Sequence, residues 1–254
     1  MLRSRTLGAL LIGGAAAACV LFSPDILLVP GRAMGRVYLA AQHGLDAEAN
    51  RTHVNPHLVN LPADELLHGV QERLSARGHT YRSDLHAKDE SSLDSLTARQ
   101  LQVVDALLRS LENPAVRADL GSQLDADLAD QSTEHGGLAL YRGGLVFQDI
   151  PADLSAAGNE GYATPRRAIA EPHLAHYHLH ATRDDNSAEA GPSQPDRLFC
   201  EMLADAFGEY HCVVFSQLPG NAFNADYYGG DFSSENAYGE AAPSVLLDLG
   251  DYGY

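Results

Sequence analysis

The sequence predicts an α/β (α+β) domain in which a small mixed β-sheet is flanked by helices and preceded by a helical N-terminal region. Three observations support this prediction. Apolar residues recur at helical spacing between residues 62 and 128. After Gln131 the pattern changes to short alternating or Val-rich runs, and a further helical stretch separates the last two of them. This order of elements is typical of a sheet that packs against helices.

The predicted helices are marked by their ends as well as by their apolar spacing. Pro62 begins the first and Gly78 follows it, as expected for a helix with Pro in its first turn and Gly after its last. The second is predicted to begin at a capping box formed by Ser91 and Asp94 and to end at the Asn-Pro pair 113–114. A third, weaker helix is expected to follow this pair.

The predicted strands come after the third helix, which is expected to span residues 114–128. Two short apolar runs separated by Arg-Gly-Gly indicate a β-hairpin. A later run alternates, so that three histidines project to one side and apolar residues to the other. The hairpin strands, the histidine-bearing strand, a helix and a Val-rich strand are predicted at residues 138–141, 145–147, 173–181, 196–207 and 211–215.

The two ends of the chain differ from its middle in composition. Residues 1–30 carry two arginines followed by an apolar run, which is typical of a cleaved signal peptide, a lipoprotein signal with Cys19, or an N-terminal membrane anchor. Each alternative predicts an exported protein, periplasmic or tethered to the membrane and facing outside the cytoplasm. Residues 31–90 are predicted as a helical and loop region, 91–218 as the main domain, and 219–254, which are acidic and rich in Tyr and Gly, as a flexible tail.

Charge and cysteine content restrict the expected partners. The chain has 34 acidic against 17 basic residues and a formal net charge of −17, so its field repels phosphate backbones and nucleic acid is not an expected partner. Three cysteines are too few for a disulfide scaffold or a Cys-based zinc site. Cys200 and Cys212 are predicted either as a disulfide, which export permits, or as two buried thiols.

The histidine-bearing strand suggests a metal site. Two histidines at positions i and i+2 of a strand share a face, so His178 and His180 can reach one ion, and neutral imidazole suits zinc. His176 lies on the same face and is an alternative to either. Asp196, at the start of the following helix, can supply a third ligand, although helix capping would also explain it. Three protein ligands leave the fourth tetrahedral position to water, as in catalytic zinc sites.

Further residues in a fixed order extend this hypothesis. Glu134 stands at the edge of the first strand and precedes a Gly pair. His178 and His180 form an HxH motif, and Ser193 with Asp196 forms an SxxD motif. Together these motifs resemble, in order and approximate spacing, the JAMM (JAB/MPN) zinc metalloprotease superfamily.

The resemblance covers roughly residues 95–216 and implies a JAB/MPN-like metallohydrolase domain over residues 91–218. It implies that three residues bind Zn²⁺: His178, His180 and Asp196. It also implies that Glu134 acts as general base and that Ser193 helps to stabilise the oxyanion.

The function predicted from these motifs is an exported zinc-dependent hydrolase of amide, peptide or isopeptide bonds that uses metal-activated water. Its substrate would be a peptide or protein in the cell envelope or outside the cell. One alternative is a catalytically inactive JAB/MPN-like module for binding or assembly, because one fold can host active and inactive members. Another is an envelope protein that binds metal without hydrolysis.

Overall fold

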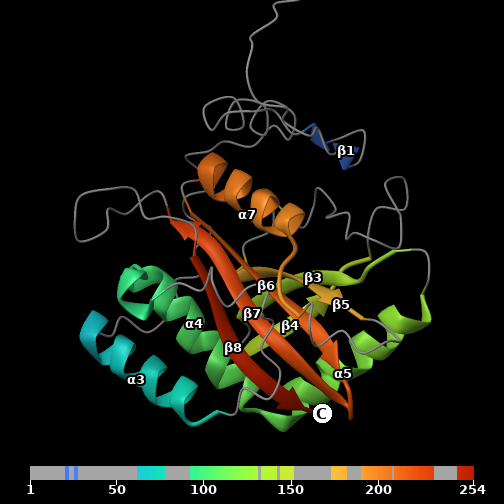
Figure 1. Ribbon diagram of the computed structural model, residues 1–254, viewed down its shortest axis with the longest axis horizontal. Helices are drawn as coiled ribbons and strands as arrows, with labels where there is room; N and C mark the ends of the chain where they lie inside the picture. Colours follow the sequence, from blue (N-terminus) through green and yellow to red (C-terminus); the bar gives the residue numbers. More distant parts are fainter. Residues whose placement is uncertain are drawn as a thin grey trace, which may run out of the picture.

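The computed structural model describes residues 21–22, 26–27, 62–77, 92–130, 133–141, 144–151, 173–181, 190–207, 209–231 and 245–254. Their elements confirm the predicted mixed class, because helices precede a six-stranded mixed sheet and pack against it (Figure 1). Apart from a short pairing of β1 (Leu21–Phe22) with β2 (Ile26–Leu27), the predicted signal or anchor lies outside these ranges. Within these ranges, no helix combines the length and apolar character needed to cross a bilayer.

Three helices confirm the predicted helical region. They are α3 (Ala63–Ser75), α4 (Ala98–Leu111) and α5 (Pro114–Ala129). Asn113 separates the last two, and its side-chain oxygen accepts a hydrogen bond from the backbone N–H of Ala115 at 3.0 Å. Pro114 occupies the first position of α5, where a helix makes no use of a backbone N–H.

The start of α4 differs from the prediction. A 3₁₀ turn, η1 (Leu93–Ser95), occupies the place where the sequence predicts the first turn of the helix. The capping box is formed by Thr97 and Gln100, whose backbone N–H groups each donate to the side chain of the other. The pairing of Ser91 with Asp94 is therefore wrong as the cap, because Thr97 with a glutamine three places later satisfies both N–H groups. Ser91 lies outside the described residues.

Six strands form the main sheet in the order β4-β3-β5-β6-β7-β8. They are β3 (Gly136–Tyr141), β4 (Leu145–Asp149), β5 (Ala175–His180), β6 (Glu209–Leu218), β7 (Ala222–Asp231) and β8 (Val245–Gly253). The first two confirm the predicted hairpin, and the next two confirm the histidine-bearing and Val-rich strands. Among these strands only β5 and β6 pair in parallel. The predicted helix α7 (Gln194–Phe207) lies between them in the chain and allows the crossover.

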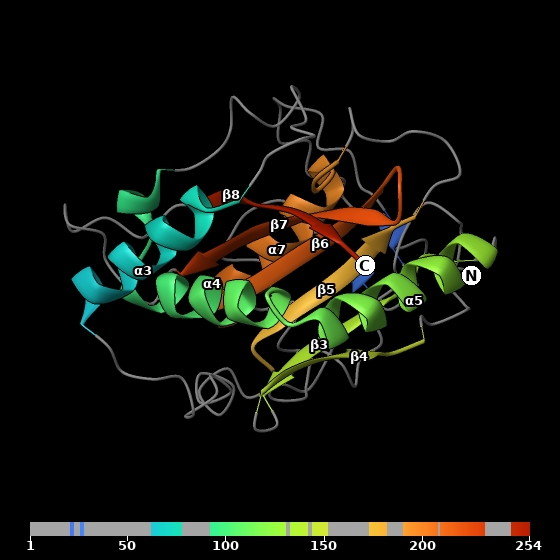
Figure 2. The same cartoon turned by 90° about the horizontal axis from the view of Figure 1, so that it is seen from below.

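Helices cover both faces of the sheet. Helix α7 lies on one face, and α3, α4 and α5 lie on the other (Figure 1 and Figure 2). On the side of α4 the core contains edge-to-face aromatic pairs, with the ring centre of Phe147 5.4 Å from that of Tyr177 and 5.1 Å from that of Phe215. On the side of α7 a disulfide joins Cys200 to Cys212 of β6, which decides between the two alternatives that the sequence left open.

The last two strands correct the prediction of a flexible tail. Residues 222–231 pair along their whole length with β6, and residues 245–253 pair with β7. Phe223 and Tyr227 are fully buried in the core on the α4 side. Gly229 permits a close approach of the strands, because a Cβ atom there would lie 2.6 Å from the carbonyl oxygen of Tyr210. The main domain therefore extends past residue 218, and the tail prediction is wrong for both segments.

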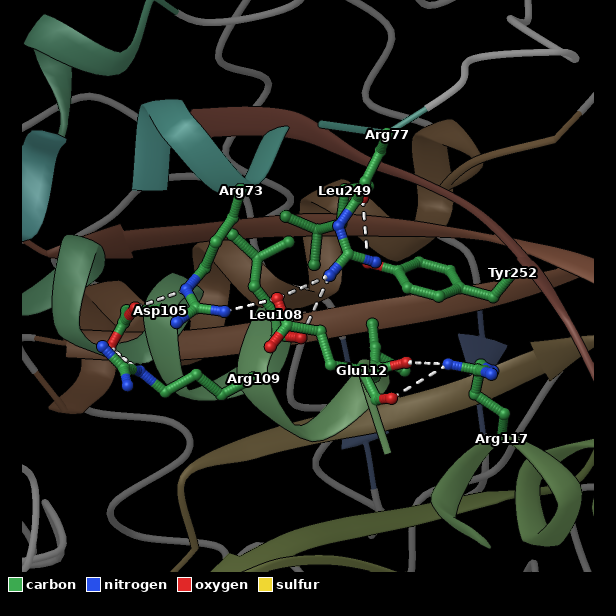
Figure 3. A network of polar contacts seen from close by, with 10 residues as sticks. Arg73, Arg77, Asp105, Leu108, Arg109, Glu112, Arg117, Leu249 and Tyr252 are labelled. Carbon is green, nitrogen blue, oxygen red and sulfur yellow. Dashed lines mark hydrogen bonds and ion pairs between the residues drawn. The ribbon is translucent and has the colours of Figure 1, made fainter. Parts of the chain in front are cut away.

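A polar network joins the N-terminal helices to the last strand (Figure 3). Arg73 of α3 forms an ion pair with Glu112. Arg77 donates to the carbonyl oxygen of Leu108 at 3.3 Å, and its guanidinium lies 4.5 Å from the ring centre of Tyr252 in β8. From α5, Arg117 donates to a carbonyl oxygen near the end of β8 at 2.9 Å. Helix α3 and strand β8 thus belong to the same folded unit.

We predict that Glu209 at the start of β6 makes the stability of the fold pH-dependent. Burial raises the pKa of Glu209, but hydrogen bonds and charges from His211 and Arg99 outweigh this effect and hold the pKa below its usual value of 4.5. The folded state therefore favours the carboxylate, whose contribution is present above about pH 4.5 and is lost as the pH falls further. Glu209→Gln should lower the free energy of unfolding by about 1 kcal/mol near neutral pH and by much less near pH 3. Urea titrations followed by circular dichroism measure this difference, and a difference that does not change with pH would contradict the prediction.

Candidate metal centre

The structure brings the three predicted ligands together at one end of β5. His178 and His180 are on the same face of this strand. Asp196 lies in the first turn of α7. The Nε2 atoms of the two imidazoles are 3.0 Å apart. The Oδ2 atom of Asp196 lies 3.4 Å from Nε2 of His178 and 3.5 Å from Nε2 of His180.

These three distances fit a zinc ion. A tetrahedral zinc ion with bonds of about 2.0–2.1 Å holds its ligand atoms roughly 3.3–3.4 Å apart. The observed separations of 3.0, 3.4 and 3.5 Å lie on both sides of this value. Two imidazoles and one carboxylate are also a known donor set for catalytic zinc, although other divalent transition metals accept the same donors.

Glu134 lies beside the histidine pair. One carboxylate oxygen of Glu134 and one ring nitrogen each of His178 and His180 all lie within 4.8 Å of one another. The position follows from the sheet, because Glu134 precedes β3 and Gly136 of this strand pairs directly with His178. Gly137 allows the tight start of β3, where a Cβ atom would lie 2.0 Å from the carbonyl oxygen of Gln148. Glu134 is therefore close enough to exchange a proton with a molecule bound between the histidines.

Ser193 forms a cap with Asp196 at the start of α7. The hydroxyl of Ser193 donates to Oδ2 of Asp196 at 2.6 Å, and the backbone N–H of Ser193 donates to the same oxygen at 2.7 Å. Asp196 thus takes the place of the acidic residue in a capping box, three places after Ser193. Capping and metal binding are compatible, because the cap holds the same carboxylate oxygen that faces the histidines.

The charges around Asp196 favour its carboxylate form. Burial raises its pKa, but the charge of His178 and the hydrogen bonds from His178 and His180 outweigh this effect and hold the pKa well below its usual value. The described residues place Glu134, His178 and His180 around one point, a group that does not include the alternative ligand His176. Asp196 joins the two histidines through its distances of 3.4 and 3.5 Å to their Nε2 atoms. The ring of His176 lies 5.9 Å from that of Phe199 in α7, and burial, followed by His178 and His173, lowers its pKa well below the usual value.

Asp127 is a supporting residue that the sequence interpretation missed. It lies near the end of α5 and is buried. Its carboxylate accepts a hydrogen bond from the backbone N–H of His135 at 2.8 Å and a second from the backbone of Ala181. These residues directly follow Glu134 and His180. Burial raises the pKa of Asp127 to about 6, although the two hydrogen bonds oppose the rise. The sequence did contain a signal for this role. Asp127 stands seven places after Leu120 and therefore shares the apolar face of the predicted helix, where an acid is unusual.

Tyr228 is a second supporting residue that was missed, because it lies in the segment predicted to be a tail. It comes from β7 and is 3 % exposed. Its Oη atom lies 3.3 Å from Nδ1 of His178, on the side of the ring opposite to Asp196. Burial raises the pKa of Tyr228 well above its usual value, and the charges of Asp196 and Glu134 add to this effect.

Comparisons with known proteins identify no relative of this chain. No protein-family model matches it, and searches of curated proteins and of solved structures also give no match. The similarity to the JAMM superfamily therefore remains a prediction from the motifs described above.

We predict that Asp127→Ala destabilises the protein. The substitution leaves two backbone N–H groups without their acceptor, and the cost is about 1–3 kcal/mol of unfolding free energy if they stay dry. Asp125→Ala is the matched control, because it removes an exposed carboxylate from the same helix and should change stability by no more than about 0.5 kcal/mol. Urea unfolding of both variants near pH 4 measures the effect, because at higher pH the raised pKa of Asp127 adds an opposing cost of ionising the buried acid. Equal stability of the two variants would show that the Asp127 carboxylate does not hold these segments.

Proposed function

We propose that this protein is a zinc-dependent hydrolase of amide, peptide or isopeptide bonds. The observation that carries the proposal is the triangle of donor atoms from His178, His180 and Asp196, with edges of 3.0, 3.4 and 3.5 Å. Glu134 next to this triangle adds the proton acceptor that hydrolysis requires. The order of these residues along the chain matches the JAMM pattern.

The proposed division of roles follows from the positions of the side chains. A bound zinc ion supplies Lewis acidity, which lowers the pKa of water from 15.7 to about 7 and polarises a carbonyl group. His178, His180 and Asp196 hold the ion, and the carboxylate offsets part of its charge. Glu134 takes the proton from the attacking water and passes it to the leaving amine.

Ser193 has two proposed tasks. In the structure its hydroxyl donates to Asp196 at 2.6 Å and so orients the carboxylate. The JAMM resemblance assigns the same hydroxyl to the oxyanion, and that task requires Ser193 to turn its proton from Asp196 toward the substrate.

The proposed setting is outside the cytoplasm. It is based on the two arginines and the apolar run within residues 1–30. We propose a peptide or protein of the cell envelope or its surroundings as the substrate. In the anchor and lipoprotein alternatives, the N-terminus is a membrane tether. The net charge of −17 makes nucleic acid a poor candidate.

The zinc site predicts the metal content of the protein and of two variants. The wild-type chain should retain one equivalent of zinc after dialysis, whereas His178→Ala and Asp196→Ala should each lose most of it, because two protein ligands hold zinc weakly. His68→Ala is the matched control, since the side chain of His68 is 71 % exposed on α3. Elemental analysis by mass spectrometry gives the stoichiometry. Full zinc retention in His178→Ala would remove this histidine from the ligand set.

The role of Glu134 predicts a separation of binding from turnover. Glu134→Gln keeps the shape of the side chain but cannot accept the proton, so zinc should be retained while hydrolysis falls by about 10²–10⁴-fold. A library of quenched-fluorescence peptides, read by mass spectrometry for the cleaved bond, supplies the assay. Turnover that survives the substitution would contradict the proposed mechanism. A wild-type protein that binds zinc and cleaves no member of the library would favour the inactive binding module or a metal-binding protein without hydrolysis.

A further inference from the structure

Strand β7 brings a phenol to the rear of the proposed zinc site. Tyr228 pairs with Cys212 of β6, and Cys212 pairs in turn with His176 of β5. Tyr228 therefore lies on the same face of the sheet as the histidines. From this position it reaches diagonally to His178, whose ring it meets edge to face with the ring centres 6.4 Å apart.

The two ring nitrogens of His178 face different partners. Nε2 faces Nε2 of His180 and the carboxylate of Asp196. Nδ1 faces Oη of Tyr228 at 3.3 Å. Both side chains are almost completely buried, with 4 % of His178 and 3 % of Tyr228 exposed. In such a dry place a ring N–H that loses its acceptor finds no water to replace it.

The tautomer of His178 follows from this arrangement if Nε2 binds an ion. A neutral imidazole that offers the lone pair of Nε2 to a metal carries its proton on Nδ1. That proton needs an acceptor, and the oxygen of Tyr228 lies within reach of Nδ1 at 3.3 Å. Histidine ligands of metals commonly donate their second N–H to such an acceptor, which fixes the orientation of the ring.

We propose that Tyr228 is a positioning residue whose phenol oxygen accepts the Nδ1 proton of His178 and so fixes the tautomer that presents Nε2 to zinc. The inference rests on the proposed zinc site and adds a residue that the motif of the resemblance does not contain. It also gives the C-terminal strands a role in the site, because β7 carries the acceptor. The disulfide between Cys200 and Cys212 lies against the same strand, with Sγ of Cys200 3.6 Å from the carbonyl oxygen of Tyr228.

The affinity test compares two buried tyrosines in full-length protein. Tyr228→Phe removes the acceptor and keeps the ring, so the dissociation constant for zinc should rise about 10–100-fold. Tyr210→Phe is the matched control, because Tyr210 belongs to the same buried cluster on the α7 side and the proposal gives its hydroxyl no part in holding His178. The control should change the dissociation constant by less than about threefold, which corresponds to the small effect of removing a hydroxyl that does not orient a zinc-binding side chain. Competition with a chromophoric chelator measures both constants.

A spectroscopic test separates positioning from a general loss of stability. In the zinc-loaded wild-type protein, nitrogen-15 NMR of the imidazole rings should show His178 protonated at Nδ1, with slow exchange of that proton with water. Faster exchange of this proton in Tyr228→Phe would support the proposal. If Tyr228→Phe does not fold, the wild-type spectrum alone decides: absence of a protected Nδ1 proton on His178 overturns the proposal.

The outcomes distinguish a failure of the proposed zinc site from a failure of the role proposed for Tyr228. A wild-type protein that does not bind zinc overturns the proposed function, and this inference with it. A wild-type protein that binds zinc, together with a Tyr228→Phe variant of equal affinity and an unchanged His178 spectrum, overturns the role of Tyr228 alone and leaves the proposed function standing.

Discussion

The convergence of three donor atoms at the end of β5 is the constraint on which the proposed function depends. His178 and His180 come to one face because side chains on a strand alternate. Asp196 joins them because β5 and β6 pair in parallel, and a parallel pair needs a crossover that carries the chain back across the sheet. The crossover contains α7, and the serine cap at its start holds Asp196 against the histidines. Local periodicity and topology therefore act together to build the triangle.

The elements that support this triangle come from before and after β5 in the chain. Asp127, on α5, connects the segments that follow Glu134 and His180. Tyr228, on β7, contacts the rear of His178. Both side chains are buried beside backbone or ring atoms that need a hydrogen-bond partner, so each contributes more than its single contact would contribute at the surface. The proposed ligands are therefore positioned by packed helices and strands, as precise metal binding requires.

Local sequence patterns predicted the helices, the hairpin and strands β5 and β6, because these elements show clear periodicity and recognisable ends. They did not predict β7 and β8, whose Gly and Asp content gives a weak local signal. The stability of these strands depends on the pairing of β7 with β6 and of β8 with β7. The grouping of Glu134 with the histidines followed from motif order rather than from local structure. Tyr228 could not be assigned before its strand was known, and the correct cap of α4 was hidden by a second capping pattern a few residues earlier.

The most direct test of the central claim is a crystal structure of the zinc-loaded protein with anomalous scattering measured at the zinc absorption edge. The account predicts one strong peak about 2.0–2.2 Å from Nε2 of His178, Nε2 of His180 and Oδ2 of Asp196, with the Glu134 carboxylate nearby but not bound to the ion. A zinc peak elsewhere in the protein, or none between these three atoms at saturating zinc, would contradict the account.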